Sequence, residues 1–367
     1  MVTTVVLDGQ VVATSWFSLP GARSLAIFLV GWGAGWLLFL RIRSLPSTEL
    51  PRQCRASVIV PCRNEAANLG ALLAKLEAAL RVGDEIIVVD DESTDETAGI
   101  AAAAGARLVQ VGAPPAGWAG KPHACWRGAQ QAGGDVLVFL DADVRPTPSG
   151  LHDLIALSEA NPDAVVSAMP WHRTVGAVEG FSMLFNTVSS LVASIAGGNS
   201  RHRVAYGPFL AVHRTMYEQV GGHAHPAVRG AVVEDLALAR VMPRAVATVA
   251  RRTQVEYRMY PHGARQLWEG WSKNTAIGAS SVPRSSAIAS IAWVFSLCGG
   301  PLTSAWCYLL SLAQVLVMAR RVGNFGAWSA VLYPLHAAFF VLVALRSAVR
   351  SVLFGRVAWR GRVIATR

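Results

Sequence analysis

Long apolar stretches flank a middle segment of mixed polarity along this chain. Three stretches hold no Asp, Glu, Lys or Arg: residues 24–40, 287–319 and 325–345. A bilayer core takes roughly 20 helical residues, so each stretch is long enough, or nearly so, to cross a membrane. The second is longer than one crossing needs and is interrupted by Gly299-Gly300-Pro301. It is therefore either one kinked helix or a short membrane-dipping piece followed by a span.

Charged residues beside these stretches predict the orientation of the chain. Arg41 and Arg43 follow the first stretch, and no small-residue cleavage pattern does, so we interpret it as a retained anchor instead of a signal peptide. Cytosolic loops carry the excess of Lys and Arg, which places the middle of the chain in the cytosol. Six arginines and no acid follow Leu345, which favours a cytosolic C-terminus beside anionic lipid.

These patterns predict a multi-pass protein of the cytoplasmic membrane with its central domain in the cytosol. We expect five parts: an extracytoplasmic segment 1–22, an anchor 23–41, a cytosolic domain 52–283, a membrane region of about two spans 286–346 and a basic cytosolic tail 347–367.

The middle segment alternates short apolar runs with helical patterns. "ASVIVPC" (56–62) reads as a buried strand, and leucines at helical spacing follow it. "DEIIVVDDESTDE" (84–96) shows the same order of strand and helix, with a strand at 86–89. The following helix is expected to begin at Ser93 and Glu96, which have the spacing of a capping box. We expect further strands at 108–111 and 136–140 and a helix at 123–132. Continuously apolar strands separated by helices predict an α/β fold with a mostly parallel, Rossmann-like sheet flanked by helices.

Two pairs of carboxylates stand at the ends of predicted strands. Asp90 and Asp91 follow one strand, and Asp141 and Asp143 follow another. Ligands of such sheets collect at the carboxyl ends of the strands, so we expect all four side chains in one crevice. Crowded carboxylates repel one another unless a cation joins them. Mg²⁺ or Mn²⁺ takes oxygen ligands and keeps positions for substrate phosphates, which predicts a metal–diphosphate site.

Composition supports the membrane interpretation and weakens a nucleic-acid one. The 367 residues are 53% hydrophobic and only 15% charged, with a mean hydropathy of +0.38, which is too apolar for an ordinary soluble enzyme. The net charge of +10 comes largely from arginines beside the apolar stretches, and no nucleic-acid recognition module is present. We therefore expect the lipid bilayer as a partner and no nucleic acid.

Several motifs together resemble a known family. Neither G-x-G-x-x-G nor a P-loop follows the first strand. Instead "VIVPCRNEA", "VVDDESTD", "GWAGKPHAC", "VLVFLDADVRP" and "VVEDLALARVM" occur in that order. Over residues 56–275 this set resembles the family 2 glycosyltransferases of the GT-A type. The resemblance implies a GT-A catalytic domain between N-terminal and C-terminal transmembrane helices.

The flanking segments are similar to one subgroup of that family. The anchor, "YPHGARQLWEGWSKN" (260–274), the C-terminal apolar stretches and "WRGR" resemble the membrane-bound members associated with carotenoid and hopanoid pathways. Cys62 and Glu92 depart from the common pattern, in which an aromatic or small residue and a glycine stand there. The Q-x-x-R-W signature of processive synthases is absent, which argues against polymer synthesis.

The resemblance also implies roles for individual residues. At the nucleotide end it places Asp91 on the base, Asp90 in support, and Pro61, Arg63, Asn64 and Glu65 as lining residues. In the D-x-D motif, Asp143 is the metal ligand and Asp141 contacts ribose or metal. Asp235 of the Glu234-Asp235 pair matches the catalytic base, and Lys121 suits a diphosphate.

Each of these assignments has a structural alternative. The pairs Asp90-Asp91 and Glu234-Asp235 suit helix starts, and Lys121 suits a solvated loop. Trp268 and Trp271 share one face of a helix that could line an acceptor groove or lie at the bilayer interface, where Trp is enriched; we favour the interface. The apolar pattern of residues 181–198 fits either ordinary core or a wall that guides an apolar acceptor.

The expected activity is inverting, metal-dependent transfer of a hexose. The donor is a nucleotide sugar, a UDP-sugar by preference, and the acceptor is a membrane lipid such as a carotenoid or hopanoid. The alternatives are a polyprenyl-phosphate or other glycolipid sugar transferase, a sugar-phosphate nucleotidylyltransferase and a non-catalytic membrane scaffold. A nucleotidylyltransferase should have a Gly- and Arg-rich loop where this chain has "PCRNEA".

Overall fold

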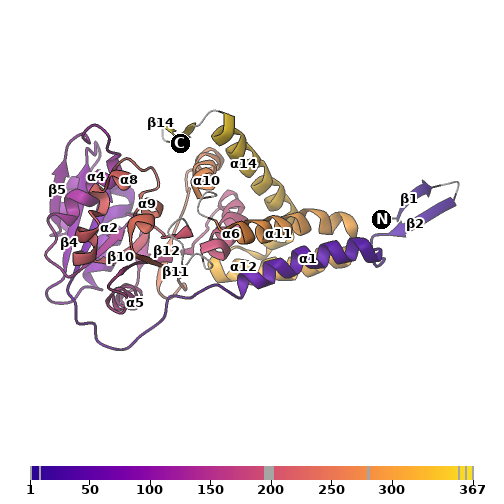
Figure 1. Ribbon diagram of the computed structural model, residues 1–367, viewed down its shortest axis with the longest axis horizontal. Helices are drawn as coiled ribbons and strands as arrows, with labels where there is room; N and C mark the ends of the chain where they lie inside the picture. Colours follow the sequence, from indigo (N-terminus) through magenta and orange to yellow (C-terminus); the bar gives the residue numbers. More distant parts are fainter. Residues whose placement is uncertain are drawn as a thin grey trace.

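The molecule has a sheet-based part at one end and a group of long apolar helices at the other (Figure 1). The structure is a computed structural model, and it describes residues 2–7, 10–193, 202–278, 282–353, 356–359 and 362–365. Two small hairpins lie near the chain ends, namely β1 (Val2–Leu7) with β2 (Gln10–Ser15) and β13 (Arg356–Trp359) with β14 (Arg362–Ala365).

A seven-stranded sheet organises the first part. Its order is β11-β8-β10-β6-β3-β4-β5. Only β10 runs antiparallel to its neighbours, β6 and β8, while the other pairs are parallel. The strands are β3 (Ala56–Cys62), β4 (Glu85–Asp91), β5 (Arg107–Val111), β6 (Val136–Leu140), β8 (Ala164–Met169), β10 (Phe209–His213) and β11 (Arg244–Val249). The predicted mostly parallel α/β sheet is confirmed.

Helices cover both faces of this sheet because successive strand residues point to opposite sides. In β3, Val58 and Val60 pack with one set of helices and Ile59 with the other. The first set is α2 (Ala66–Glu77), α3 (Thr97–Ala103) and α5 (Pro148–Glu159). The second is α4 (Gly120–Ala129), α7 (Arg214–Gln219), α8 (Pro226–Arg229) and α9 (Glu234–Val241).

The predicted capping box at the start of α3 is wrong. The N-cap residue is Glu96, and it makes no side-chain cap hydrogen bond. The Ser93 hydroxyl instead accepts the Asn64 N–H at 2.9 Å, so it joins the turns after β3 and β4. Asp95 accepts the Thr97 N–H at 3.1 Å, at the start of the helix.

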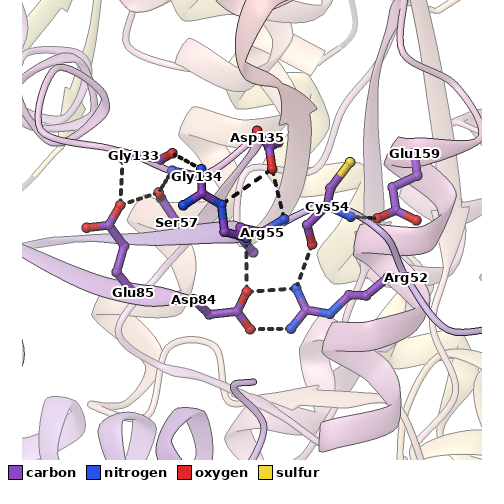
Figure 2. A network of polar contacts seen from close by, with 11 residues as sticks. Arg52, Cys54, Arg55, Ser57, Asp84, Glu85, Gly133, Gly134, Asp135 and Glu159 are labelled. Carbon is purple, nitrogen blue, oxygen red and sulfur yellow. Dashed lines mark hydrogen bonds and ion pairs between the residues drawn. The ribbon is translucent and has the colours of Figure 1, made fainter. Parts of the chain in front are cut away.

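A polar network fastens the amino ends of the strands, at the opposite edge from their acidic ends (Figure 2). Arg52 and Asp84 form an ion pair whose side chains are both only 2% exposed. Asp84 also accepts the Ala56 N–H at 2.9 Å, and Glu85 accepts the Ser57 hydroxyl at 2.6 Å. The segment that leads from the first apolar helix into the sheet is thereby fixed to β3 and β4.

Three helices are long and apolar enough to cross a membrane among the described residues. They are α1 (Ala22–Phe39), α11 (Arg284–Thr303) and α12 (Ala305–Val322). The long apolar stretch therefore forms two helices that separate at Ser304, with Pro301 inside the first. The third stretch forms α13 (Ala327–Val331) and α14 (Tyr333–Leu353), whose apolar part, Tyr333–Val349, is shorter.

The apolar helices pack closely on one another and on the edge of the sheet. A Cβ at Gly31 would lie 2.4 Å from the Ala292 carbonyl oxygen, and one at Gly35 would lie 2.4 Å from the Trp293 ring. The glycines of α1 therefore allow close contact with α11. A single apolar cluster joins these helices to Met169 of β8 and Val249 of β11.

Two further helices and a small sheet connect the two parts. The helices are α6 (Met183–Ala193) and α10 (Ala264–Gly278), and η1 (Val178–Ser182) precedes α6. The small sheet has the order β7-β12-β9, with strands Val144–Pro146, Val255–Tyr257 and Trp171–His172. Residues 194–198 of the predicted apolar helix lie outside the described residues.

Candidate active site

The D-x-D segment forms the turn between β6 and β7. The Val144 N–H donates to the Asp141 carbonyl at 3.1 Å, which closes the turn around Asp143. Burial, followed by the charges of Asp141 and Glu65, raises the pKa of Asp143 to about 7. Carboxylates so close to one another share protons or attract a cation, as the sequence predicts for this motif.

Lys121 joins this turn to a distant helix. It lies in the first turn of α4, and its Nζ is 2.7 Å from Asp141 Oδ1 and 2.7 Å from Glu234 Oε1. Burial favours the neutral amine, but Asp141 and Glu234 outweigh it and hold the pKa of Lys121 well above its ordinary value. Lys121 is therefore a cation between two acids and not a lysine in a solvated loop.

Glu234 and Asp235 occupy the first turn of α9. Asp235 accepts two backbone N–H groups, from Gly207 at 2.6 Å and from Leu236 at 2.8 Å. A Cβ at position 207 would lie 2.9 Å from Asp235 Oδ2, so glycine permits this approach. Burial, followed by the charge of Glu234, raises the pKa of Asp235 to about 6.

One pocket brings these groups together. Lys121, Asp141, Glu234 and Asp235 all line it, with Pro61 at the end of β3. Residues that are up to 174 positions apart in the sequence therefore meet at the carboxyl edge of the sheet. Asp91 and Asp143 are not among its lining residues. Asp141 and the pair Glu234-Asp235 therefore face one pocket, whereas Asp143 lies outside its lining.

The second acidic pair, at the end of β4, does not join the cluster. Asp90 accepts the Ser93 N–H at 3.2 Å, and Asp91 lies 3.5 Å from the Arg63 guanidinium. The expectation of four carboxylates around one cation is therefore wrong, because β3 lies between β4 and β6 and neighbouring strands are about 4.8 Å apart. Asp91 remains close to the site, because its Oδ2 would lie 2.7 Å from a Cβ at Gly120, the residue before Lys121.

Asn64 and Glu65 hold the turn after β3. Asn64 has a left-handed backbone, with φ 56°, and its side-chain oxygen accepts the Thr94 N–H at 2.8 Å. Glu65 accepts the Asn68 amide at 2.9 Å and precedes α2 as its N-cap residue. Both residues thus have structural partners at the position where the family resemblance implies contact with a nucleotide.

The acids present suit a metal that is shared with a phosphate ligand. Within the described ranges, no group of three or more His, Cys, Asp or Glu side chains is arranged to hold a metal ion. Mg²⁺ commonly uses only one or two protein carboxylates, with substrate phosphates and water completing its shell. Asp143 and Asp141 can supply that number, and the raised pKa of Asp143 reflects a place where a cation would relieve repulsion.

Sequence reasoning missed buried polar residues near the acids on the C-terminal side. Burial raises the pKa values of Tyr257 and Tyr260, and the charge of Asp143 adds to both shifts. Burial lowers the pKa of Lys273, and the charge of Glu234 opposes this shift. No periodicity marks these residues, and only the resemblance of residues 260–274 draws attention to the segment.

Trp271 is buried inside the protein, so the predicted bilayer interface is wrong for this ring. It is 4% exposed, its Nε1 donates to the Ser182 hydroxyl at 3.0 Å and it stacks on Phe185 at 4.7 Å. Trp268 is half-buried, with its ring 5.6 Å from Phe339 and the Arg346 guanidinium 5.2 Å from its centre. Both rings pack α10 against neighbouring helices.

Comparison with known proteins gives one family and one group of relatives. Residues 57–220 match the family model described as "Glycosyl transferase family 2". The chain is 30% identical over 362 residues to 4,4'-diaponeurosporenoate glycosyltransferase of Staphylococcus aureus, strain USA300. That alignment covers 92% of this chain and 95% of the relative. The likeness therefore includes the apolar helices as well as the sheet.

Solved structures of related shape include two glycosyl-transferring enzymes. A mannosyltransferase from Pyrobaculum calidifontis, in complex with GDP-Man and Mn²⁺, has 19% identity and a TM-score of 0.49, over 89% of this chain and 98% of its own. Glucosyl-3-phosphoglycerate synthase from Mycobacterium tuberculosis, with Mn²⁺, UDP-Glc and phosphoglyceric acid, has 21% identity and a TM-score of 0.40, over 73% and 87%.

Proposed function

The chain belongs to the family 2 glycosyltransferases, and we propose that it transfers a sugar from a nucleotide-diphosphate sugar to a carotenoid-type lipid in the membrane. The observation that carries the proposal is Lys121, whose ammonium bridges Asp141 and Glu234 beside Asp235 in one pocket. A cation and several acids therefore lie together in one pocket. These are the groups needed to stabilise a departing diphosphate and to take a proton from a nucleophile. The name of the relative supports the acceptor class.

Membership confirms the resemblance, the enzyme class and the GT-A type of fold that the sequence predicts. A GT-A domain is an α/β unit with a mostly parallel sheet, and the seven-stranded sheet with helices on both faces has that architecture. The helices at both ends of the chain are the candidate membrane spans.

The donor end of the site is assigned to Asp143, Asp141 and Lys121. Asp143, with Asp141 beside it, would hold Mg²⁺ or Mn²⁺. When bound, the metal supplies positive charge against the diphosphate as it departs. The Lys121 ammonium adds a second charge, since a cation beside a developing phosphate anion lowers the barrier to its departure. Asp91, near Arg63, reads the base of a UDP-sugar, with Asp90, Asn64, Glu65 and Pro61 around it.

The acceptor end is assigned to Asp235, with Glu234 as its neighbour. Asp235 takes the proton from the acceptor as the acceptor oxygen attacks the anomeric carbon. Its two backbone N–H partners hold the carboxylate in one orientation, and its raised pKa makes it a stronger base than an aspartate in water. Attack from the face opposite the leaving diphosphate inverts the configuration in one step.

The candidate membrane helices support a lipid acceptor. A lipid acceptor does not leave the bilayer readily, so an enzyme held in the membrane meets it by lateral diffusion. We propose that the parts predicted from the sequence keep their places: residues 52–283 form the cytosolic catalytic domain, and residues 1–22 lie outside the cell. The basic tail, 347–367, lies on the cytosolic face beside anionic lipid.

The test is sugar transfer by protein purified in detergent. UDP-glucose and a carotenoid acceptor are supplied with Mn²⁺, and products are identified by mass spectrometry. We expect Asp143→Asn to weaken the apparent affinity for Mn²⁺ by more than the roughly 10–100-fold typical of outer-shell changes. Asp163→Asn, an exposed acid paired with Arg244 on the far edge of the sheet, is the matched control.

Different results would reject separate parts of the proposal. Transfer by Asp143→Asn with unaltered dependence on Mn²⁺ would reject the metal assignment. Transfer to a hopanoid or a polyprenyl phosphate but to no carotenoid would reject the acceptor class. Chromatographic analysis of the anomeric configuration of the product tests inversion, and a product that keeps the configuration of the donor would reject the single-displacement step.

A further inference from the structure

Lys121 is shared between two acids that come from different parts of the fold. Its ammonium lies 2.7 Å from Asp141 Oδ1, in the turn after β6, and 2.7 Å from Glu234 Oε1, in the first turn of α9. All three residues line the same pocket. A positive charge in the first turn of a helix is unfavourable, so the two acids, and not helix α4, determine where the ammonium lies.

The helices that carry the lysine and the glutamate, α4 and α9, belong to one packed unit. The Ala119 N–H, just before α4, donates to the Arg229 carbonyl at 2.8 Å. A Cβ at Gly230 would lie 3.1 Å from the Gly117 carbonyl oxygen, so the loop before α4 lies against the segment between α8 and α9. One apolar cluster contains residues of α4, α8 and α9. The lysine and the glutamate are therefore held near each other by the backbone as well as by their charges.

The two acids differ in their exposure to water. The side chain of Glu234 is 8% exposed, whereas that of Asp141 is 29% exposed. Separating an ion pair costs more where the charges are buried, because a buried charge without its partner is not solvated. The contact of Lys121 with Glu234 is therefore the harder one to break, and Asp141 is the acid that can change its partner.

Asp141 has a second use in the proposed reaction, because with Asp143 it would hold the divalent metal. An ammonium on Asp141 Oδ1 repels a second cation at the same carboxylate. The diphosphate of the donor is an alternative partner for Lys121, and the N-terminus of α4 also favours an anion, since unpaired backbone N–H groups lie there. A lysine that is held by Glu234 can therefore turn from Asp141 to the diphosphate.

We propose that Glu234 is a positioning residue, which holds the Lys121 ammonium when Asp141 releases it in order to bind the metal. The inference rests on the proposed function, and it assigns Glu234 to the donor side of the reaction in addition to its place beside Asp235. Glu234 contacts neither the metal nor the sugar in this role and acts through Lys121. Without Glu234, Lys121 keeps Asp141 as its partner and opposes the metal.

The test is a double-mutant cycle on metal binding, with no sugar transfer involved. Mn²⁺ is titrated into the full-length protein in detergent without donor, and the free ion is measured by electron paramagnetic resonance. Glu234→Ala should raise the apparent Kd for Mn²⁺ roughly tenfold, the effect of about one hydrogen bond to a charged group. The same change made in Lys121→Met should alter the Kd by less than about twofold, because the competing ammonium is then absent.

A second substitution and a matched control guard against a general disturbance of the fold. Glu234→Gln keeps the shape of the side chain without its charge, so it should raise the Kd in the wild-type background and leave it unaltered in Lys121→Met. Glu269→Ala removes a glutamate that pairs with Arg265 outside the pocket lining, and it should leave the Kd unaltered in both backgrounds.

The contrary outcomes separate this inference from the proposed function. An equal rise of the Kd in both backgrounds would show that Glu234 acts on the metal directly, and it would overturn the inference alone. An unaltered Kd in Glu234→Ala would do the same. A wild-type protein that binds no Mn²⁺, with or without UDP, would reject the metal assignment of the proposed function as well.

Discussion

At the scale of single residues, the environment of Asp235 makes it suitable for proton transfer. An aspartate in water has a pKa of about 3.9, whereas burial and the adjacent Glu234 raise that of Asp235 to about 6. The hydrogen bonds from Gly207 and Leu236 and the charge of Lys121 act in the opposite direction and keep the group ionised near neutral pH. A base with these properties loses its function when it is protonated.

This predicts the acidic limb of the pH profile. With an acceptor that reacts through a hydroxyl group and with saturating Mn²⁺, kcat/KM should fall about tenfold per pH unit below pH 6, because only ionised Asp235 accepts a proton. Asp235→Asn should lower kcat/KM roughly 10²–10⁴-fold and remove that limb. A variant that keeps the limb centred near pH 6 would show that another group is the base.

At the scale of elements, buried aromatic contacts hold α10 against α6 and α14. Its position depends on Trp271, which fills space between Phe185 and Tyr260. Gly270 allows this packing, since a Cβ there would lie 2.3 Å from the Tyr260 ring. Trp271 and Asn274 both bond to other elements, which holds this end of α10 in place.

This packing predicts different costs for the two tryptophans of α10. Trp271→Ala should lower the free energy of unfolding by about 3–5 kcal/mol, the usual loss for a buried aromatic ring. Trp268→Ala should cost less, because that ring is already half-exposed. Thermal unfolding of the purified proteins in the same detergent, followed by circular dichroism, gives the comparison. Equal losses would contradict the burial argument.

At the scale of the whole molecule, the sheet and the apolar helices share one core. Met169 and Val249 at the sheet edge pack with Trp293, Val315 and other residues of the long helices. The bonds that tie the segment after α1 to the sheet include the Leu45 N–H to the Val249 carbonyl at 3.1 Å and the Arg52–Asp84 pair (Figure 2). The pocket therefore has a defined direction relative to the helices that we place in the membrane.

The buried ion pair predicts a test of this connection. Asp84→Ala leaves the Arg52 charge buried and also removes the acceptor of the Ala56 N–H, so we expect a loss of about 3–5 kcal/mol in the free energy of unfolding. Asp163→Ala breaks an exposed pair with Arg244 and should cost about 0–1 kcal/mol. Denaturation of both variants by heat in detergent checks the difference, and similar midpoints would contradict it.

The sequence by itself determined the elements whose signals are local. The strand at 56–62, the strand at 136–140 and the apolar helices follow from continuous runs of apolar residues, because burial of such a run is favourable wherever the chain places it. It also identified the carboxylates at the strand ends, since parallel strands present those ends at one edge. The motifs that contain these carboxylates resemble a known family, and this resemblance predicted the correct enzyme class.

Only the tertiary structure decided which of these groups act together. Strand order separates Asp90 and Asp91 from Asp141, and the insertion of antiparallel β10 beside β6 brings Gly207 to Asp235. Helix packing turned Trp271 inward, against Phe185 and Ser182. Such contacts join residues far apart in the chain, and their energy depends on distance and burial, two quantities that the order of amino acids does not contain until the chain is folded.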